Sequence, residues 1–84
     1  RYIGIRLREN CDSNTILNNT IYSNSDHGIY LFWDCDSNII SENNANYNIR
    51  GGISLHFNCT YNTISNNTSN DNRNSNFVMF SWFW

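Results

Sequence analysis

Apolar residues recur along the 84-residue chain with a period of 24 residues. The clearest marker is the tetrapeptide Gly-Ile-x-Leu, which begins at Gly4, Gly28 and Gly52. Five further positions keep the same register without an insertion: Cys11, Cys35 and Cys59; Asn14, Asn38 and Asn62; Ile16, Ile40 and Ile64; Asn19, Asn43 and Asn67; and Asn24, Asn48 and Asn72. A period of this length predicts a stack of equal structural units.

Within each repeat the apolar residues come in short bursts, such as Ile5 with Leu7, then Ile16, then Ile21. Asn, Asp and Ser lie between the bursts, and these residues tolerate left-handed bends and hydrogen-bond their own backbone. No segment has the i, i+3, i+4, i+7 stripe of an amphipathic helix. The pattern therefore predicts an all-β solenoid, a parallel β-helix of about three coils, each with three short strands and three bends.

We expect one β-helix segment over residues 1–84, cut from a longer helix, because the chain starts without Met or a signal peptide. The predicted coils are about 4–27, 28–51 and 52–75, and residues 76–84 begin a further coil or cap the stack. Phe77 and Met79 then take the Ile and Leu places. Open ends and the aromatic tail predict self-association of the isolated chain.

Stacking places identical residues of successive coils about 4.8 Å apart. The Asn columns can then pair their amides along the stack, and the Gly column marks a place where a Cβ is unwelcome. A leucine-rich repeat has a similar period, but Asn14 and its equivalents stand where that repeat needs Leu, and no helix is available.

Composition narrows the range of functions. Asn fills 18 of 84 positions, yet an aromatic content of 15% and the strict period argue against disorder. The net charge is −2 and the five Arg are dispersed, so nucleic acid is not an expected partner. No apolar run reaches the roughly 18 residues of a membrane-spanning helix.

The pattern Gly-Ile-x-Leu followed by Asn-x-Ile-x-x-Asn, repeated over residues 2–79, resembles the right-handed parallel β-helix repeats of the NosD-like family and its carbohydrate-binding and sugar-hydrolase relatives. The resemblance implies a right-handed helix and an extracytoplasmic location: periplasmic, at the cell surface or secreted. It also implies a polysaccharide or cell-surface glycan as partner. Roles in that family extend from copper-site maturation through surface-layer and adhesin-like proteins to polysaccharide degradation.

Cysteine and histidine are the candidate ligands for copper. Cys11, Cys35 and Cys59 share one repeat position among core residues, which favours an inert buried column, although a disulfide or a Cu(I) site is an alternative. His27 and His56 occupy different repeat positions, and we expect them to be solvated. Since no H-x-x-H or C-x-x-C spacing occurs, no metal site is assigned.

Carboxylates are the candidate catalytic groups. Asp12 and Asp36 stack in adjacent coils, and Asp34 lies two residues earlier on the same expected strand. Such a pair can serve as general acid and base or hold Ca²⁺. Asp is also an ordinary bend residue, and Thr60 takes this place in the third coil. No catalytic residue is assigned. The alternative functions are a fragment of a polysaccharide lyase or hydrolase that uses these Asp residues and a periplasmic copper-handling protein.

The outward side of the Gly-Ile-x-Leu strand is the candidate binding surface. Its predicted outward residues are Arg6, Tyr30 and Ser54, followed by Arg8, Phe32 and His56. In the predicted ligand site, aromatic rings form a platform for a sugar and carboxylates accept hydrogen bonds from its hydroxyls. The residues of this site are Tyr30, Phe32, Trp33, Asp34, Asp36 and His56. The alternative is that Phe32 or Trp33 turns inward to fill a bend. The expected function is a non-catalytic structural or ligand-presenting segment that binds carbohydrate.

Overall fold

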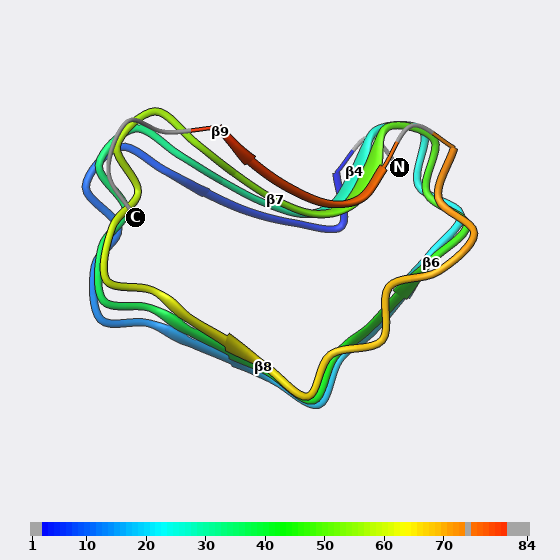
Figure 1. Cartoon of the computed structure of the whole chain (residues 1–84), viewed down its shortest axis with the longest axis horizontal. Helices are drawn as coiled ribbons and strands as arrows, with labels where there is room; N and C mark the ends of the chain where they lie inside the picture. Colours follow the sequence, from blue (N-terminus) through cyan, green and yellow to red (C-terminus); the bar gives the residue numbers. More distant parts are fainter. Residues whose placement is uncertain (1–2, 74, 81–84) are drawn as a thin grey trace.

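The computed structural model describes residues 3–73 and 75–80. The chain is wound into stacked three-sided coils (Figure 1). The strands are β1 (Ile5–Arg8), β2 (Thr15–Leu17), β3 (Thr20–Tyr22), β4 (His27–Phe32), β5 (Ile39–Ser41), β6 (Asn44–Asn46), β7 (Gly51–His56), β8 (Thr63–Ser65) and β9 (Ser75–Phe80). All strand pairs in this part of the chain are parallel. The described residues include no helix that is long and apolar enough to cross a membrane.

Each side of the coil is one parallel sheet. The first sheet has the order β1-β4-β7-β9, the second β2-β5-β8 and the third β3-β6. Pairing partners are 24 residues apart, as in Ile5 with Ile29 and Ile16 with Ile40. The predicted all-β fold of about three 24-residue coils is confirmed. In the fourth strand of the first sheet, Phe77 is the partner of Ile53.

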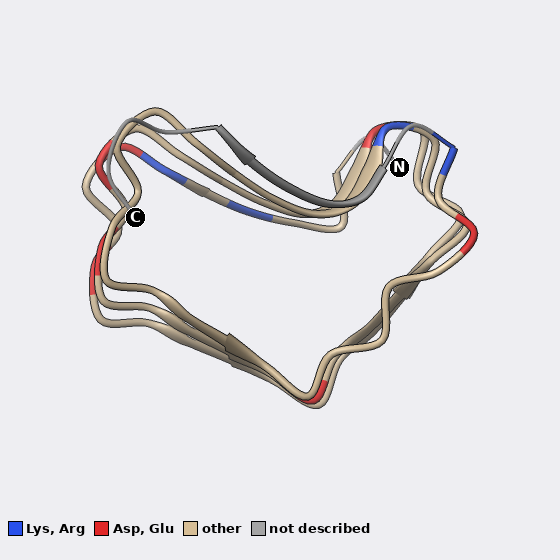
Figure 2. Ribbon diagram, viewed as in Figure 1, with Lys and Arg blue, Asp and Glu red and all other residues tan. Residues whose placement is uncertain are grey.

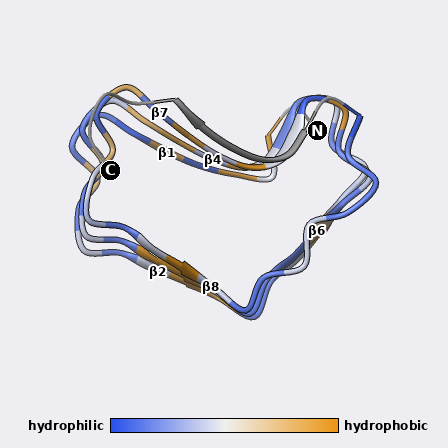
Figure 3. Cartoon of the chain, in the orientation of Figure 1, coloured by the Kyte–Doolittle hydropathy of each residue, from blue (hydrophilic) through white to orange (hydrophobic). Residues whose placement is uncertain are grey.

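The interior of the coil is a column of apolar layers. Its buried residues are Ile16, Ile21, Ile29, Leu31, Cys35, Ile40, Ala45, Ile53, Leu55 and Cys59. In Figure 3 the apolar segments of successive coils lie over one another. Side chains alternate between the two faces of a strand, so Ile29 and Leu31 point inward and are 0% exposed. Full burial of such a side chain stabilises the fold by about 1.5–3 kcal/mol.

The Asn columns join each coil to the one before it. Asn43 shows the pattern: its Oδ1 accepts from the backbone N–H of Asn19 at 3.0 Å, and its Nδ2 donates to the carbonyl of Ile16 at 2.9 Å. The equivalent contacts are made by Asn38, Asn48, Asn62, Asn67 and Asn72. Bend groups that would otherwise be buried without a partner are thereby satisfied.

The bends rest on left-handed backbone at five positions of the repeat. Positive φ angles occur at Glu9, Asn10, Ser13, Asn18, Ser23, Trp33, Asp34, Ser37, Glu42, Tyr47, Phe57, Asn58, Tyr61, Asn66 and Asp71. The glycines are needed for another reason. A Cβ on Gly28 would lie 2.7 Å from the carbonyl oxygen of Gly52 and 2.8 Å from Nδ2 of Asn48. Close approach of neighbouring coils therefore explains the Gly column.

Candidate functional site

The outer face of the first sheet carries the predicted outward residues. This sheet bows toward the interior of the coil between the bends at its two ends (Figure 1). On its outer side Tyr30, Phe32 and His56 are half-buried, and Ser54 is fully buried. Phe32 belongs to this face, and Trp33 is 41% exposed. The alternative in which either ring fills the interior of a bend is therefore wrong.

Six rings gather here into one group, the aromatic cluster: His27, Tyr30, Phe32, Trp33, His56 and Phe57. The imidazole of His27 stacks on Tyr30 with centroids 4.2 Å apart and an interplanar angle of 8°. Phe32 stacks on Tyr30 at 4.7 Å. The edge of His56 meets Tyr30 at 5.0 Å. Because these rings pack against one another, the faces between them are not available to a ligand.

Trp33 and Phe57 form the exposed end of the cluster. They are 41% and 51% exposed, and their centroids lie 6.1 Å apart at an angle of 55°. Both have left-handed backbone, with φ of 65° and 57°. Such backbone costs a bulky residue about 1–2 kcal/mol. The bend backbone of the next coil holds Trp33, whose N–H donates to the carbonyl of His56.

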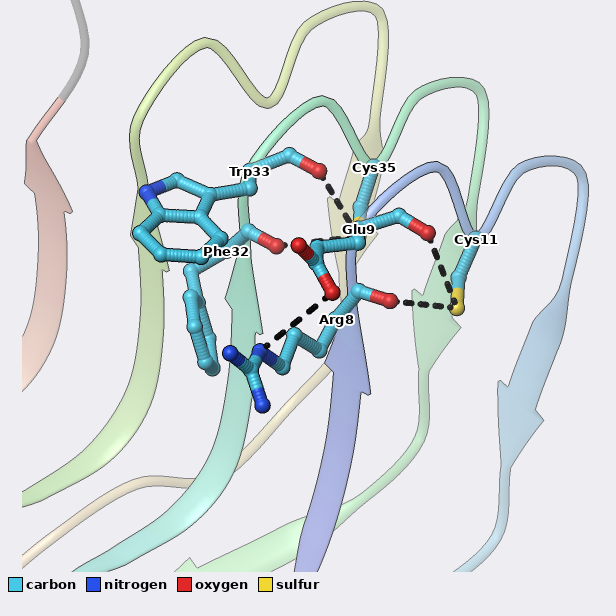
Figure 4. Close-up of polar contacts among 6 residues, drawn as sticks. All are labelled: Arg8, Glu9, Cys11, Phe32, Trp33 and Cys35. Carbon is cyan, nitrogen blue, oxygen red and sulfur yellow. Dashed lines mark hydrogen bonds and ion pairs between the residues drawn. The ribbon is translucent and has the colours of Figure 1, made fainter.

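Arginine lies beside these rings. The Cζ of Arg8 is 5.6 Å from the centroid of Phe32 and 5.4 Å from that of Trp33. Its Nε lies 3.6 Å from Oε1 of Glu9 (Figure 4). Guanidinium over an aromatic face is a favourable cation–π arrangement. Arg6, two residues earlier on β1, pairs in register with Tyr30.

Both histidines belong to the packed part of the cluster, contrary to the expectation that they are solvated. The His27 side chain is 12% exposed, and its Nδ1 lies 2.7 Å from Oδ1 of Asp26. Burial lowers the pKa of His27, Asp26 opposes this, and Arg50 adds to it. Burial and the neighbouring His27 also lower the pKa of His56. Both imidazoles are therefore neutral at neutral pH.

The carboxylates of two candidate catalytic residues bond to the bends. Oδ1 of Asp12 accepts from the backbone N–H of Asp36 at 2.8 Å, and Oδ1 of Asp36 accepts from both N–H and Oγ1 of Thr60 at 2.8 and 2.9 Å. Asp34 has left-handed backbone just after β4 ends, so its expected place on the strand is wrong. Across the described residues, no three His, Cys, Asp or Glu gather as possible ligands of one metal ion.

The cysteines form a column of free thiols along the stack. Cys35 and Cys59 are buried, and Cys11 is partly exposed in the first coil. Each Sγ donates to the carbonyl three residues earlier, at 3.2 Å for Cys11 (Figure 4). Burial raises the pKa of Cys35 to about 11 and also raises that of Cys59. Because metals bind thiolates, this environment favours packing over metal binding.

The structure thus joins four of the predicted site residues, Tyr30, Phe32, Trp33 and His56, and places Asp34 and Asp36 on the bend that follows them. Sequence reasoning missed two members of the cluster. Phe57 stands 24 residues after Trp33, so the repeat itself could have indicated it. His27 directly precedes Gly28, and its stacking on Tyr30 depends on side-chain packing that no spacing reveals.

Comparison with known families agrees with this architecture. The model of the right-handed β-helix region matches residues 1–82. No match was found among curated proteins or among solved structures. The family match covers nearly the whole chain. The described strands of the chain form parallel sheets in which paired residues are 24 positions apart. The chain belongs to the right-handed β-helix family.

Proposed function

We propose that this β-helix segment is a non-catalytic, extracytoplasmic, NosD-like module that presents a carbohydrate-binding surface. The observation that carries the proposal is the exposed ring pair, Trp33 and Phe57, continuous with the packed rings of the outer face. Large aromatic rings beside polar groups suit a ligand that has both an apolar face and hydroxyls. A sugar has that character.

The two exposed rings, Trp33 and Phe57, are attached to a well-packed part of the scaffold. Trp33 and Phe57 follow β4 and β7, whose inner residues Leu31 and Leu55 are buried in the core. Side chains placed by rigid, packed strands lose little freedom when a ligand binds. The left-handed backbone under both rings belongs to the bend that each coil makes at this position, where Glu9 stands in the first coil.

The hydrogen bonds of the carboxylates support a non-catalytic role. Asp12 and Asp36 use carboxylate oxygens to satisfy backbone N–H groups of the next coil. A catalytic carboxylate must be free to reach a substrate, whereas these oxygens are engaged by the backbone of the bends. These two residues therefore act as bend residues in the proposed function.

Titration of the full chain with a panel of soluble polysaccharides, followed by tryptophan fluorescence and calorimetry, tests the proposal. Trp33→Ala and Phe57→Ala should each weaken binding about tenfold or more, because about 1.4 kcal/mol of contact is tenfold in affinity. Tyr61→Ala is the matched control: this ring is 81% exposed and also has left-handed backbone. Binding to no glycan, equal losses in the control, or cleavage of a bound polysaccharide would each overturn the proposal.

A further inference from the structure

Four segments of the chain match Asn-x-Ser/Thr, the acceptor sequence for N-linked glycosylation. They begin at Asn18, Asn58, Asn66 and Asn67. Because Asn is abundant in this chain, the sequence alone does not separate acceptors from chance matches. An acceptor needs a surface position at which both the amide and the hydroxyl two residues later can reach the transferase. The structure separates the four segments on this basis.

The segment that begins at Asn67 is part of an Asn column. Oδ1 of Asn67 accepts from the N–H of Asn43 at 2.9 Å, and its Nδ2 donates to the carbonyl of Ile40 at 2.8 Å. Ser69, which would supply the hydroxyl, is 4% exposed. A transferase could use this segment only after the coils had separated.

The segment that begins at Asn58 is engaged through its hydroxyl. Oγ1 of Thr60 donates to Oδ1 of Asp36 at 2.9 Å, and the backbone N–H of Thr60 donates to the same oxygen at 2.8 Å. These contacts hold Thr60 to the preceding coil. Binding of its hydroxyl by a transferase would break a contact between coils.

The other two segments present both groups. Asn18 and Asn66 are exposed and share one position of the repeat, in bends with φ of 58° and 54°. Thr20 and Thr68, two residues later, are exposed as well. In the part of the chain that the structure describes, none of these four side chains makes a hydrogen bond.

We propose that Asn18 and Asn66 are acceptor sites for N-linked glycosylation. This inference rests on the extracytoplasmic location in the proposed function, because transfer takes place outside the cytoplasm. The donor is an oligosaccharide linked to a polyisoprenyl diphosphate. Nδ2 of the asparagine attacks C1 of the first sugar, and the bond from C1 to the diphosphate oxygen breaks. A C1–N bond forms, and Nδ2 loses one proton to a base of the transferase.

The corner that carries these residues suits the attachment of glycans. It joins the second and third sheets and lies opposite the first sheet, so glycans here leave the aromatic cluster open (Figure 1). The strands of the second and third sheets carry no Lys, Arg, Asp or Glu (Figure 2). Leu17 and Ile39 on the second sheet are 47% and 45% exposed. A bulky polar glycan beside this uncharged, partly apolar surface raises solubility.

The coil between the two acceptors has Glu42 at the same position, with φ of 56°. Since successive coils are about 4.8 Å apart, acceptors in alternate coils are separated by roughly 9.6 Å, which leaves room for a glycan on each. Glu42 also shows that the bend accepts a side chain other than Asn, so substitution at this position should leave the coil folded.

Glycosylation of the folded full chain tests the inference. The enzyme is an oligosaccharyltransferase that modifies four synthetic peptides, one for each matching segment, and the probe is its polyisoprenyl diphosphate oligosaccharide. Peptide mass spectrometry should show transfer to Asn18 and Asn66 about tenfold faster, or more, than to Asn58 and Asn67, because the stack must open locally before the latter react. Asn18→Gln and Asn66→Gln should each remove one glycan.

A relocated acceptor is the matched control. In the chain with Asn18→Gln and Asn66→Gln, the further changes Glu42→Asn and Asn44→Thr create one matching segment at the same bend of the second coil. This chain should carry one glycan, at position 42. The chain that has Glu42→Asn without Asn44→Thr should carry none.

The outcomes separate this inference from the proposed function. Unmodified Asn18 and Asn66 on the folded chain, equal rates at all four asparagines, or no transfer to the relocated segment would each overturn the acceptor sites. None of these results changes the proposed carbohydrate binding, which depends on the opposite side of the coil. Transfer as expected to a chain that binds no polysaccharide would overturn the proposed function alone. Circular dichroism of each variant confirms that the coil is intact.

Discussion

The two faces of the first sheet follow different rules. On the inner face the residue type is nearly constant from coil to coil, as Ile29 and Ile53 show, and the side chains are buried. On the outer face Arg6, Tyr30 and Ser54 share one position of the repeat. A coil can stack only if its interior matches that of its neighbours. The outer face has no such requirement, so it is there that one coil differs from the next.

The same contrast holds for the energetic role of each face. Inner residues stabilise the stack through burial and ladder hydrogen bonds, so their loss should lower the free energy of unfolding. Outer residues such as Trp33, which is 41% exposed, remain partly in contact with solvent. Their loss should change ligand binding more than stability.

The largest expected change in the free energy of unfolding comes from a substitution on the inner face. Leu31→Ala removes a side chain that is 0% exposed, and the cavity should lower the free energy of unfolding by about 3 kcal/mol. Urea denaturation measures this change. Arg6→Ala, on the outer face of the neighbouring strand, should stay within about 0.5 kcal/mol. Equal losses in the two variants would contradict the division between the faces.

The next effect concerns the Asn columns. Asn43→Ala leaves the N–H of Asn19 and the carbonyl of Ile16 without their partners, which should cost roughly 2–3 kcal/mol. The control is Asn70→Ala, because Asn70 is exposed and lies outside the three columns. If both variants unfold at the same urea concentration, the columns do not have the stabilising role described above.

A smaller effect is expected from pH. His27 and His56 have pKa values below the ordinary 6.5 in the folded chain, so the unfolded chain binds protons more readily. Their burial therefore leaves stability unaffected above pH 6.5 and lowers it as pH falls below that value. Urea midpoints compared at about pH 7.5 and about pH 5.5 should show the decrease. The double variant His27→Gln and His56→Gln should show a shallower pH dependence than the parent chain.

The last prediction concerns the cysteine column, where the smallest effect on stability is expected. The measured quantity is the rate at which each thiol is modified. With a pKa near 11, Cys35 is a thiol at neutral pH, and Cys59 is buried as well. Iodoacetamide should therefore modify Cys11, in the first coil, before the other two. Mass spectrometry of timed samples identifies the order. Equal rates for all three thiols in the folded chain would show that the column opens readily.

The inner face could be predicted from the sequence because the repeat determines it. Spacing alone placed Ile16 above Ile40 and each Asn above its equivalent, since identical coils must stack in register. The outer face could be predicted only in part. Alternation gave the outward direction of Tyr30 and Phe32, but spacing cannot say that Tyr30 packs between other rings rather than presenting a face. Nor does it show that Trp33 and Phe57 have left-handed backbone, which ordinarily favours Asn.

The Asn columns also give the stack a direction. From the second coil on, the column side chains reach back to the backbone of the preceding coil, as Asn48 does to Asn24 and Ile21. The bend backbone of each newly synthesised coil therefore gains its hydrogen-bond partners when the next coil leaves the ribosome. Elongation of the helix by whole coils at its C-terminal side leaves the existing coils unchanged, because each added coil brings the three amides that its predecessor needs. The architecture can therefore grow by tandem duplication while its outer faces diverge.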